Sequence, residues 1–281
     1  MSRVRDVAGA TIESGVPARW VAERASHRIF LGLSALLFAA SAAVTIVWCG
    51  SMSAMEGMPM PGGWTMSMAW MRMPGQTWPE AAATFVGMWV VMMVAMLLPS
   101  LVPMLWRYRQ AVGIAGKPRL GRLTVLAGVG YFFVWSVVGG AVFLLGIALA
   151  ELAMQQPTLA RATPIAASLI VVVAGALQFG PWKAHHLACC RDAPGLGTRP
   201  ADAGTAWRHG VRMGLDCSRC CSGLMAILLV LGVMDLRAMA VVAAAITVER
   251  LAAAGERVAR AIGAVVVAAG CFMMARAAGL G

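Results

Sequence analysis

The stretch Asp216-Cys217-Ser218-Arg219-Cys220-Cys221-Ser222-Gly223-Leu224-Met225 leads directly into an uncharged apolar run that ends near Met234. It predicts a membrane helix whose first turns carry three thiols. On such a helix Cys217 faces Cys220 at i+3 and Cys221 at i+4. Sulfur recurs every four residues along one stripe of this helix, at Met213, Cys217, Cys221 and Met225. The fold and the chemistry of this chain are therefore expected to meet in one sulfur-bearing helix.

A second soft-ligand cluster, His185-His186-Leu187-Ala188-Cys189-Cys190, lies upstream of the first. On a helix, His185 and Cys189 form one i,i+4 pair, and His186 and Cys190 form another. Thiolate, thioether and imidazole groups are the ligands that suit Cu(I) and Zn(II). We expect the two clusters to converge at the inner rim of a membrane and to form one metal site.

The composition predicts an all-α, polytopic transmembrane helix bundle. Hydrophobic residues make up 60% of the 281 residues and charged residues only 12%, which is too little charge to cover a water-facing globule of this size. The net charge of +11 does not indicate nucleic-acid binding, because the basic residues lie in short runs between apolar segments. Seven spans are expected, at about 29–49, 81–106, 123–149, 164–182, 217–234, 236–248 and 261–278, with a kink or an end of the second at Pro99 and Pro103.

The distribution of basic residues predicts the orientation. With the N-terminus inside, 19 of the 23 Lys and Arg residues lie on the cytoplasmic side, and four lie outside: Arg72, Arg161, Arg237 and Arg276. We therefore expect a cytoplasmic basic segment at 1–28 and a single transmembrane domain at 29–281, with the C-terminus outside. Residues 50–80 form its outer loop and residues 183–216 its cytoplasmic Cys/His loop. The expected location is the bacterial inner membrane.

The outer loop is unusually rich in methionine. Eight of the 21 methionines fall in it: Met52, Met55, Met58, Met60, Met66, Met68, Met71 and Met73. Thioethers coordinate Cu(I) and leave most other biological cations alone, so we expect metal capture here, at Met58, Met60, Met66 and Met68 among others. The alternative is a loop that packs as a lid. Within the second span, a stripe of methionines leads inward, at Met88, Met92 and Met96. Its structural alternative is ordinary core packing.

These motifs resemble those of a bacterial family. The runs Gly87-Met88-Trp89-Val90-Val91-Met92-Met93-Val94-Ala95-Met96-Leu97-Leu98-Pro99, Lys183 to Pro194, Cys217 to Met225, Gly232-Val233-Met234-Asp235-Leu236 and Glu249-Arg250 resemble the family called domain of unknown function 2182. Its members are described as predicted metal-binding integral membrane proteins, and the resemblance spans about 81–251. Family members carry two spaced cysteines after the lysine that matches Lys183. Here His186 takes the first place and Cys190 the second, and this exchange keeps a soft donor.

The sequence favours a membrane protein that handles copper as Cu(I), by transport or by chaperone-type delivery, with zinc or another soft metal as the open alternative. Metal ion, lipid bilayer and a metal chaperone on either side of the membrane are the expected partners. A membrane thiol-disulfide oxidoreductase that uses vicinal cysteines is a rival from another class, and a mercury or other soft-metal resistance protein is a third. No phosphate-binding loop of an ATPase is present in the sequence, and an enzymatic activity is not favoured.

Overall fold

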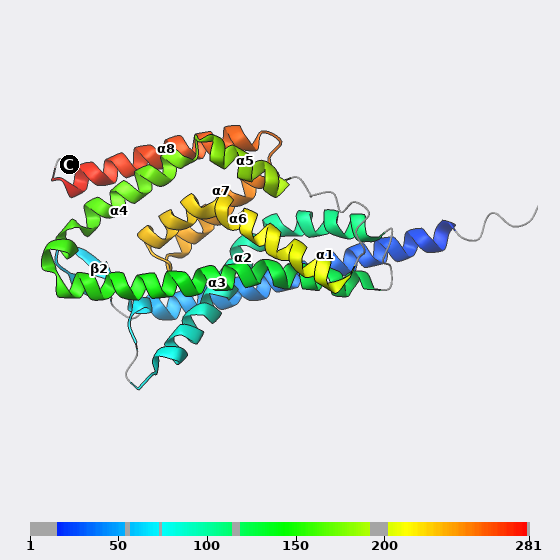
Figure 1. Ribbon diagram of the computed structural model, residues 1–281, viewed down its shortest axis with the longest axis horizontal. Coiled ribbons are helices and arrows are strands. Elements are labelled where there is room, and N and C mark those ends of the chain that lie inside the picture. The colour runs from blue at the N-terminus through cyan, green and yellow to red at the C-terminus, as the bar shows by residue number, and fades with distance from the viewer. Residues whose placement is uncertain (1–15, 54–56, 73–74, 114–118, 192–201, 280–281) are drawn as a thin grey trace, which may run out of the picture.

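The protein is an all-α helical bundle, as the composition predicts. A computed structural model describes residues 16–53, 57–72, 75–113, 119–191 and 202–279 (Figure 1). Over these ranges the chain forms eight α-helices: α1 (Val16–Ser53), α2 (Trp78–Gly113), α3 (Leu120–Gln155), α4 (Pro157–Leu177), α5 (Pro181–Arg191), α6 (Ala203–Leu231), α7 (Leu236–Leu251) and α8 (Gly255–Ala277). The predicted N-terminal segment 1–28 lies outside the described residues up to residue 15, and its remainder forms the first turns of α1.

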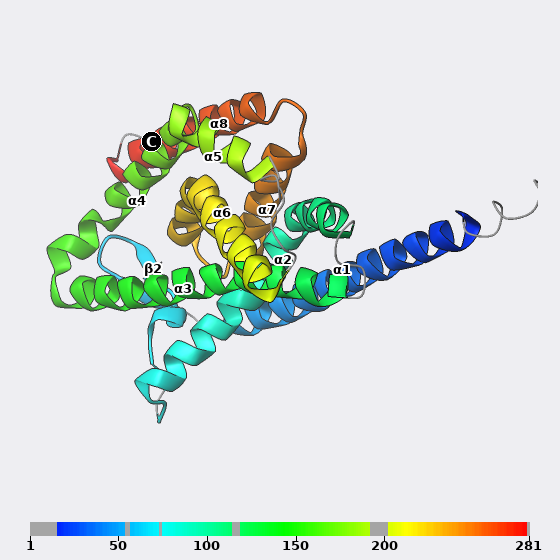
Figure 2. The same ribbon diagram turned by 45° about the vertical axis from the view of Figure 1, so that its right-hand side comes forward.

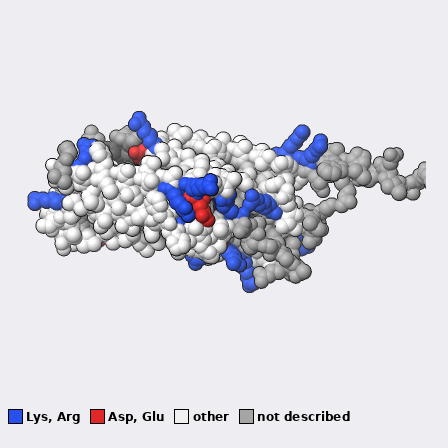
Figure 3. All heavy atoms as spheres, turned by 90° about the horizontal axis from the view of Figure 1, so that it is seen from above, with Lys and Arg blue, Asp and Glu red and all other residues white. Residues whose placement is uncertain are grey.

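Six of the described helices are long and apolar enough to cross a membrane, and this indicates a multi-pass membrane protein. They are Arg24–Met52, Trp78–Val112, Leu120–Gln155, Pro157–Leu177, Ala203–Leu231 and Gly255–Ala277. Large apolar side chains such as Val47, Leu144 and Val265 point outward from them, which is the pattern of helices that face lipid. Figure 3 shows a face on which most of the surface carries no charge and on which Lys and Arg outnumber Asp and Glu.

Of the seven predicted spans, the sixth is the one that is too short to cross a membrane by its length alone. That segment is α7, and its 16 residues rise only about 24 Å, less than the roughly 30 Å of a hydrocarbon core. Asp235 caps its first turn by accepting from the backbone N–H groups of Arg237 and Ala238. The helix ends at Leu251, just before the turn that starts α8. α7 is therefore a short helix that packs against α2, α6 and α8.

The two ends of the described chain lie at opposite ends of the molecule. In Figures 1 and 2, α1 begins at the right-hand end and α8 finishes at the left-hand end, near β2. Six complete crossings would bring both termini to the same side, so termini on opposite sides of a membrane require that α7, although short, carries the chain back from the end of α6 to the start of α8. Which side is cytoplasmic remains a prediction from the basic residues.

The helix α2 is the central helix of the bundle. It continues through Pro99 and Pro103 to Gly113, so neither proline ends it. Figure 2 shows that α2 changes direction along its length, as expected where proline removes a backbone hydrogen bond. In the most apolar stretch of α2, 61% of the residues are buried, whereas in the corresponding stretch of α1 only 17% are buried. Its sulfur-rich stripe therefore faces protein and not lipid.

Close packing of α6 on α3 depends on glycines. Gly210 and Gly214 are four residues apart on α6 and lie against α3. A methyl group at Gly210 would meet the backbone carbonyl of Ala127, and one at Gly214 would meet the carbonyl of Tyr131 at 2.8 Å. Small residues at this spacing let two membrane helices approach closely. The contact places Cys217, one turn beyond Gly214, directly over α3.

The Met-rich segment contains a short β-hairpin. Strands β1 (Met58–Met60) and β2 (Trp64–Met66) pair antiparallel, with Met58 opposite Met66, and Gly62 and Gly63 turn the chain at positive φ. The indole Nε1 of Trp64 donates to the carbonyl of Ala160 at 2.8 Å, so the hairpin docks at the turn between α3 and α4. The segment is therefore shorter and more structured than the loop predicted at 50–80, since α1 extends to Ser53.

Substitution of Gly210 by alanine should separate α6 from α3 and lower the stability of the protein. The added methyl has no room beside the Ala127 carbonyl, and overpacking of this kind costs about 1–3 kcal/mol. The matched control is Gly128→Ala on α3, where a methyl meets nothing within 4 Å. Thermal unfolding in detergent measures both. Equal midpoints for the two variants would contradict the packing role of Gly210.

Candidate metal centre

The two predicted ligand clusters lie on helices, but not where the sequence suggested. The first cluster belongs to α5 and not to a loop over 183–212, of which 192–201 lie outside the described residues. The second lies in the interior of α6, because that helix already begins at Ala203 and is extended by the capping box of Asp202 and Thr205. The thiols are therefore about 20 Å along the helix from its first residue, and not at its mouth.

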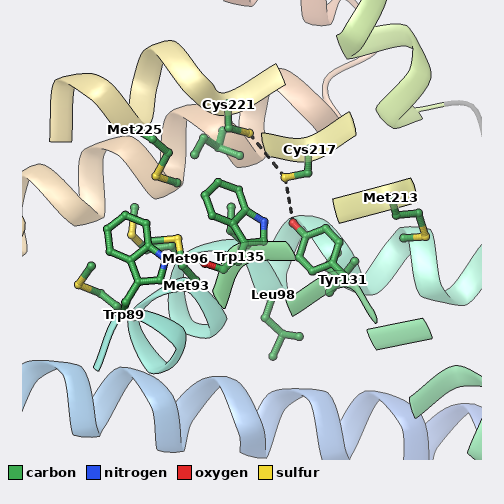
Figure 4. Packing of buried hydrophobic residues seen from close by; sticks show 14 of the residues in the cluster. Trp89, Met93, Met96, Leu98, Tyr131, Trp135, Met213, Cys217, Cys221 and Met225 are labelled. Atoms are coloured by element: carbon green, nitrogen blue, oxygen red, sulfur yellow. Dashed lines mark hydrogen bonds between the residues drawn. The ribbon is translucent and has the colours of Figure 1, made fainter. Parts of the chain in front are cut away.

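The predicted sulfur stripe of α6 is buried along its whole length. Met213, Cys217, Cys221 and Met225 are exposed by 6% or less. The Sγ atoms of Cys217 and Cys221 lie 3.8 Å apart, and the hydroxyl of Tyr131 on α3 donates to the Cys217 Sγ at 2.9 Å (Figure 4). In the view of Figure 4, the ring of Trp135 lies between these thiols and the side chains of Met93 and Met96, and Met225 lies beside Cys221 on the same helix.

A thiol from α5 joins this group. Cys190 is 2% exposed and is hydrogen-bonded to Cys220, which in turn is hydrogen-bonded to Cys221. The hydrogen bond to Cys220, together with burial, raises the pKa of the Cys190 thiol. Four thiols from two helices thus form a connected series, in the order Cys190, Cys220, Cys221 and Cys217.

The other side chains of the first cluster lie on the outer face of α5. His185 is exposed, and its Nε2 lies 3.7 Å from the Sγ of Cys189, as the i,i+4 spacing predicts. His186 is half-buried, makes an edge contact with the ring of Trp182, and has a buried Nδ1 without a hydrogen-bond partner among the described residues. The expected pair of His186 with Cys190 is not seen, since Cys190 turns to α6 instead.

A guanidinium group lies inside the thiol cluster. Arg250 on α7 is 5% exposed and donates to the Ser100 hydroxyl at 2.9 Å, to the Cys217 Sγ at 3.4 Å and to the Met104 sulfur at 2.7 Å. Its Nε is buried without a partner, and among the described ion pairs none joins it to a carboxylate. A buried cation of this kind calls for negative charge nearby.

The neighbouring charges form a neutral pair. Lys183 on α5 donates to the Glu249 carboxylate at 2.7 Å and to the Cys220 carbonyl at 2.9 Å, and both side chains are buried. Burial alone would lower the pKa of the Lys183 ammonium, but the Cys220 thiol and the Glu249 carboxylate outweigh it and raise that pKa. The pair fixes α5 against α6 and α7. Because Glu249 is paired with Lys183, the thiols are the groups that can balance the charge of Arg250.

The arrangement is suited to a small soft ion, although its donors are not yet placed around a common centre. No three His, Cys, Asp or Glu side chains in the described ranges already form a metal-holding group. At a metal–sulfur distance of about 2.3 Å, however, the 3.8 Å between Cys217 and Cys221 corresponds to an angle of about 110° at a shared ion. A linear two-coordinate ion would need the sulfurs to separate by less than about 1 Å.

The predicted methionine ligands separate into packed and accessible groups. Met88, Met92 and Met96 on α2 are buried in the main core. Met60 and Met66 of the hairpin are 9% and 2% exposed and pack with Ala150 and Ala160 as a lid would. Met58 is 37% exposed and Met68 is half-buried. The loop methionines Met55 and Met73 lie outside the described residues.

Several residues of the centre were not identified from the sequence. The four-residue spacing of Met88, Met92 and Met96 continues to Ser100 and Met104, both of which contact Arg250. That continuation was a usable signal. Lys183, Glu249 and Arg250 were noted only as part of the family resemblance, and their position as charges next to apolar segments is the signal that marks them for the centre. Nothing in the sequence marks Tyr131, whose role depends on how closely α3 and α6 approach.

Fold and centre together define a polytopic helical membrane protein with a buried cluster of thiols suited to a soft cation. The chain belongs to the family described as "PpoB2: Copper chaperone", whose model matches residues 86–273. This match covers α3 to α7 completely and most of α2 and α8, and it supports copper handling in general. No curated protein and no solved structure matches the chain.

Removal of either partner of the Lys183–Glu249 pair should destabilise the protein strongly. Lys183→Met and Glu249→Leu each leave a buried charge without its partner, which costs about 3–5 kcal/mol. The double variant removes both charges and should lose much less than the sum of the two. Thermal unfolding of the three variants in detergent tests the pair. Additive losses would show that the two side chains act independently.

Proposed function

We propose that this protein binds Cu(I) at the thiols of Cys190, Cys217, Cys220 and Cys221 and hands it on, by chaperone-type delivery or by transport. The family match supports copper handling in general. We further propose that the protein lies in the bacterial inner membrane with its N-terminus in the cytoplasm, and that the predicted membership in domain of unknown function 2182 describes the same relationship under another name.

The observation that carries the proposal is the charge of Arg250 among the thiols. Lys183 and Glu249 neutralise each other, so Arg250 contributes one uncompensated positive charge. Cu(I) with two thiolates carries a net charge of −1. Bound beside Arg250, that complex is neutral overall, and neutrality avoids the large free energy of a net charge in a low-dielectric interior.

The same argument disfavours a divalent ion in a four-thiolate site. Zn(II) with four thiolates carries −2, of which Arg250 balances only half. Zinc bound by three thiolates would be balanced, so zinc is the competing cargo to be tested. Thiolate and thioether donors together, with Met225 next along the α6 stripe, favour Cu(I).

Thioethers offer a weaker path to this centre. We propose that Met88, Met92 and Met96 on α2, together with Met225 on α6, provide exchange sites between the outer end of the bundle and the thiols. Met58, Met60, Met66 and Met68 would then act at the outer entrance, where Met58 is the most accessible of the four. At the opposite end, His185, His186 and Cys189 would take part in exchange at the mouth. Sites of graded affinity permit transfer because no single one retains the ion.

Burial argues against the rival function of a thiol-disulfide oxidoreductase. The reactive cysteines of such an enzyme need access to a partner protein, whereas the vicinal cysteines Cys220 and Cys221 are 3% and 1% exposed. A mercury-resistance protein would use the same thiolates, but Hg(II) with two thiolates is neutral and would leave the Arg250 charge uncompensated. Competition between Cu(I) and Hg(II) at the purified protein separates these two cargoes.

Replacement of the cluster cysteines should abolish tight Cu(I) binding. Under anaerobic conditions, competition with a coloured Cu(I) chelator measures affinity and stoichiometry in the detergent-purified protein. We expect Cys217→Ser and Cys221→Ser each to weaken binding by more than about a hundredfold, since loss of a direct ligand should exceed the 10–100-fold loss seen for outer-shell partners. Cys271→Ser is the matched control, because Cys271 is an exposed thiol on α8.

Equal loss in Cys271→Ser would point to a general effect of thiol removal, and full affinity in Cys217→Ser would refute the proposed ligand set. Elemental analysis of the protein as isolated provides the independent check, since copper should be present in the parent protein and absent from both cluster variants.

Removal of the Arg250 charge should weaken Cu(I) binding without removing a ligand. Arg250→Gln eliminates the positive charge that balances the bis-thiolate complex, and we expect a loss of about 10–100-fold in affinity. Arg250→Lys keeps the charge and should retain most of the affinity. The chelator competition measures both. If Lys and Gln at this position bind Cu(I) equally, the charge argument is wrong even where the thiols hold the ion.

A further inference from the structure

Two neighbouring, partly open cavities lie beside Cys190 of the thiol cluster, at the end of the bundle where α5 and α6 meet. The inner one, of about 70 Å³, is lined by Ser100, Met104, Cys190 and Arg250, among others. The outer one, of about 20 Å³, shares Met104 and Cys190 with it and continues past Cys189, His209 and Met213. We call these two cavities together the vestibule.

Guanidinium groups dominate the vestibule. Arg107 and Arg191 line both cavities, Arg212 lines the outer one and Arg250 the inner one. Asp216 is the acidic residue among the described lining, and it lies 3.7 Å from Arg219, with which it forms an ion pair. Four positive groups therefore face a space that opens onto Cys190, with at most one carboxylate to balance them.

Topology alone does not account for this arrangement. Basic residues at a cytoplasmic membrane surface are expected, and exposed Arg107 and Arg212 fit that reading. Arg250 does not fit it, because it is almost fully buried and its Nε has no partner among the described residues. The guanidinium charge therefore extends from the surface to the buried thiol cluster.

Such a vestibule disfavours a free cuprous ion. The potential of several positive groups around a narrow entrance repels a small cation and concentrates an anion. From this electrostatics we infer that copper is exchanged here as an anionic thiolate complex of a small acidic thiol, and not as the free ion. The inference builds on the proposed function, since it assumes that the thiol cluster binds Cu(I) and identifies the form in which the ion passes the vestibule.

The exchange step balances in atoms and charge. A carrier complex holds Cu(I) between two carrier thiolates, and two neighbouring protein thiols, first Cys190 at the vestibule and then Cys220, attack in turn. Two carrier Cu–S bonds break, two protein Cu–S bonds form, and the two protons of the protein thiols pass to the departing carrier thiolates. No electron moves, and the Cu(I) bis-thiolate unit keeps its charge of −1. The reverse sequence unloads the protein.

The larger of the two cavities has room for the sulfur end of such a carrier. A cavity of about 70 Å³ corresponds to roughly five water-sized volumes at 10–15 Å³ each. That space can admit a thiolate sulfur and its first carbons, while carboxylates of the carrier stay near the exposed guanidinium groups of Arg107 and Arg212.

The test compares three small carriers that differ in charge but share a thiol. Cu(I) is supplied to the purified full-length protein as its complex with mercaptopropionate, mercaptoethanol or cysteamine, which are acidic, neutral and basic. Transfer rates are measured by stopped flow at matched free Cu(I). We expect transfer from mercaptopropionate to be about ten- to a hundredfold faster than from cysteamine at low salt. The difference should shrink strongly near 1 M salt, where the Debye length is about 3 Å.

A variant of the vestibule supplies the second arm. Arg212→Gln should lower the ratio of the mercaptopropionate rate to the mercaptoethanol rate by about two- to fivefold. Arg208→Gln is the matched control, because Arg208 is an exposed arginine one turn earlier on α6 that does not line the vestibule. Its ratio should equal that of the parent protein. Because both rates are measured on the same preparation of each variant, their ratio does not depend on the fraction of the protein that is active.

Equal rates from the three carriers, or equal ratios for the two arginine variants, would overturn the inference. Either result would leave the proposed function standing if the parent protein still binds Cu(I) in the chelator competition. Absence of Cu(I) binding in that competition, in contrast, would end the proposed function and this inference with it.

Discussion

The buried guanidinium of Arg250 is the constraint on which the centre depends. It is held between the Ser100 hydroxyl and the Met104 sulfur of α2 and the Cys217 thiol of α6, so three helices meet at one charge. A lone positive charge in a membrane interior is costly unless negative charge lies beside it. The thiols can supply negative charge as thiolates. Two thiolates carry a charge of −2, and a bound cuprous ion reduces the net charge of the complex to −1. Under the proposed function, stability of the bundle and affinity for Cu(I) are therefore linked.

Backbone packing places the thiols around this charge. Gly210 and Gly214 let α6 approach α3 until the Tyr131 hydroxyl reaches Cys217. On the opposite side of α6, the Lys183–Glu249 pair fixes α5, so Cys190 meets Cys220. Two different interactions, close glycine contact and a buried ion pair, thus determine where four sulfur atoms lie. Neither interaction involves a ligand of the proposed ion.

The sequence predicted the parts of this protein that depend on local pattern. The apolar spans, the α6 sulfur stripe and the helical pairing of His185 with Cys189 follow from composition and from the 3.6-residue period. Helix ends were harder, because α2 continues through two prolines and α6 begins well before its apolar run. The pairing of Cys190 with Cys220, the place of Tyr131 and the role of Arg250 depend on contacts between distant helices, which periodicity within one segment does not encode.

The chemical gradient along the bundle explains why its two ends differ. At the hairpin end the available donors are neutral thioethers, which leave the charge of a cuprous ion unchanged. At the thiol cluster each thiolate adds one negative charge, so the ion becomes part of an anion that Arg250 can balance. Beyond the cluster the vestibule is positive. An ion that travels from thioethers to thiolates thus changes from cation to anionic complex at Cys217, and only the second form is compatible with the guanidinium groups ahead of it. Arg250 lies at that boundary, where its positive charge repels the free cuprous cation and stabilises the anionic bis-thiolate complex.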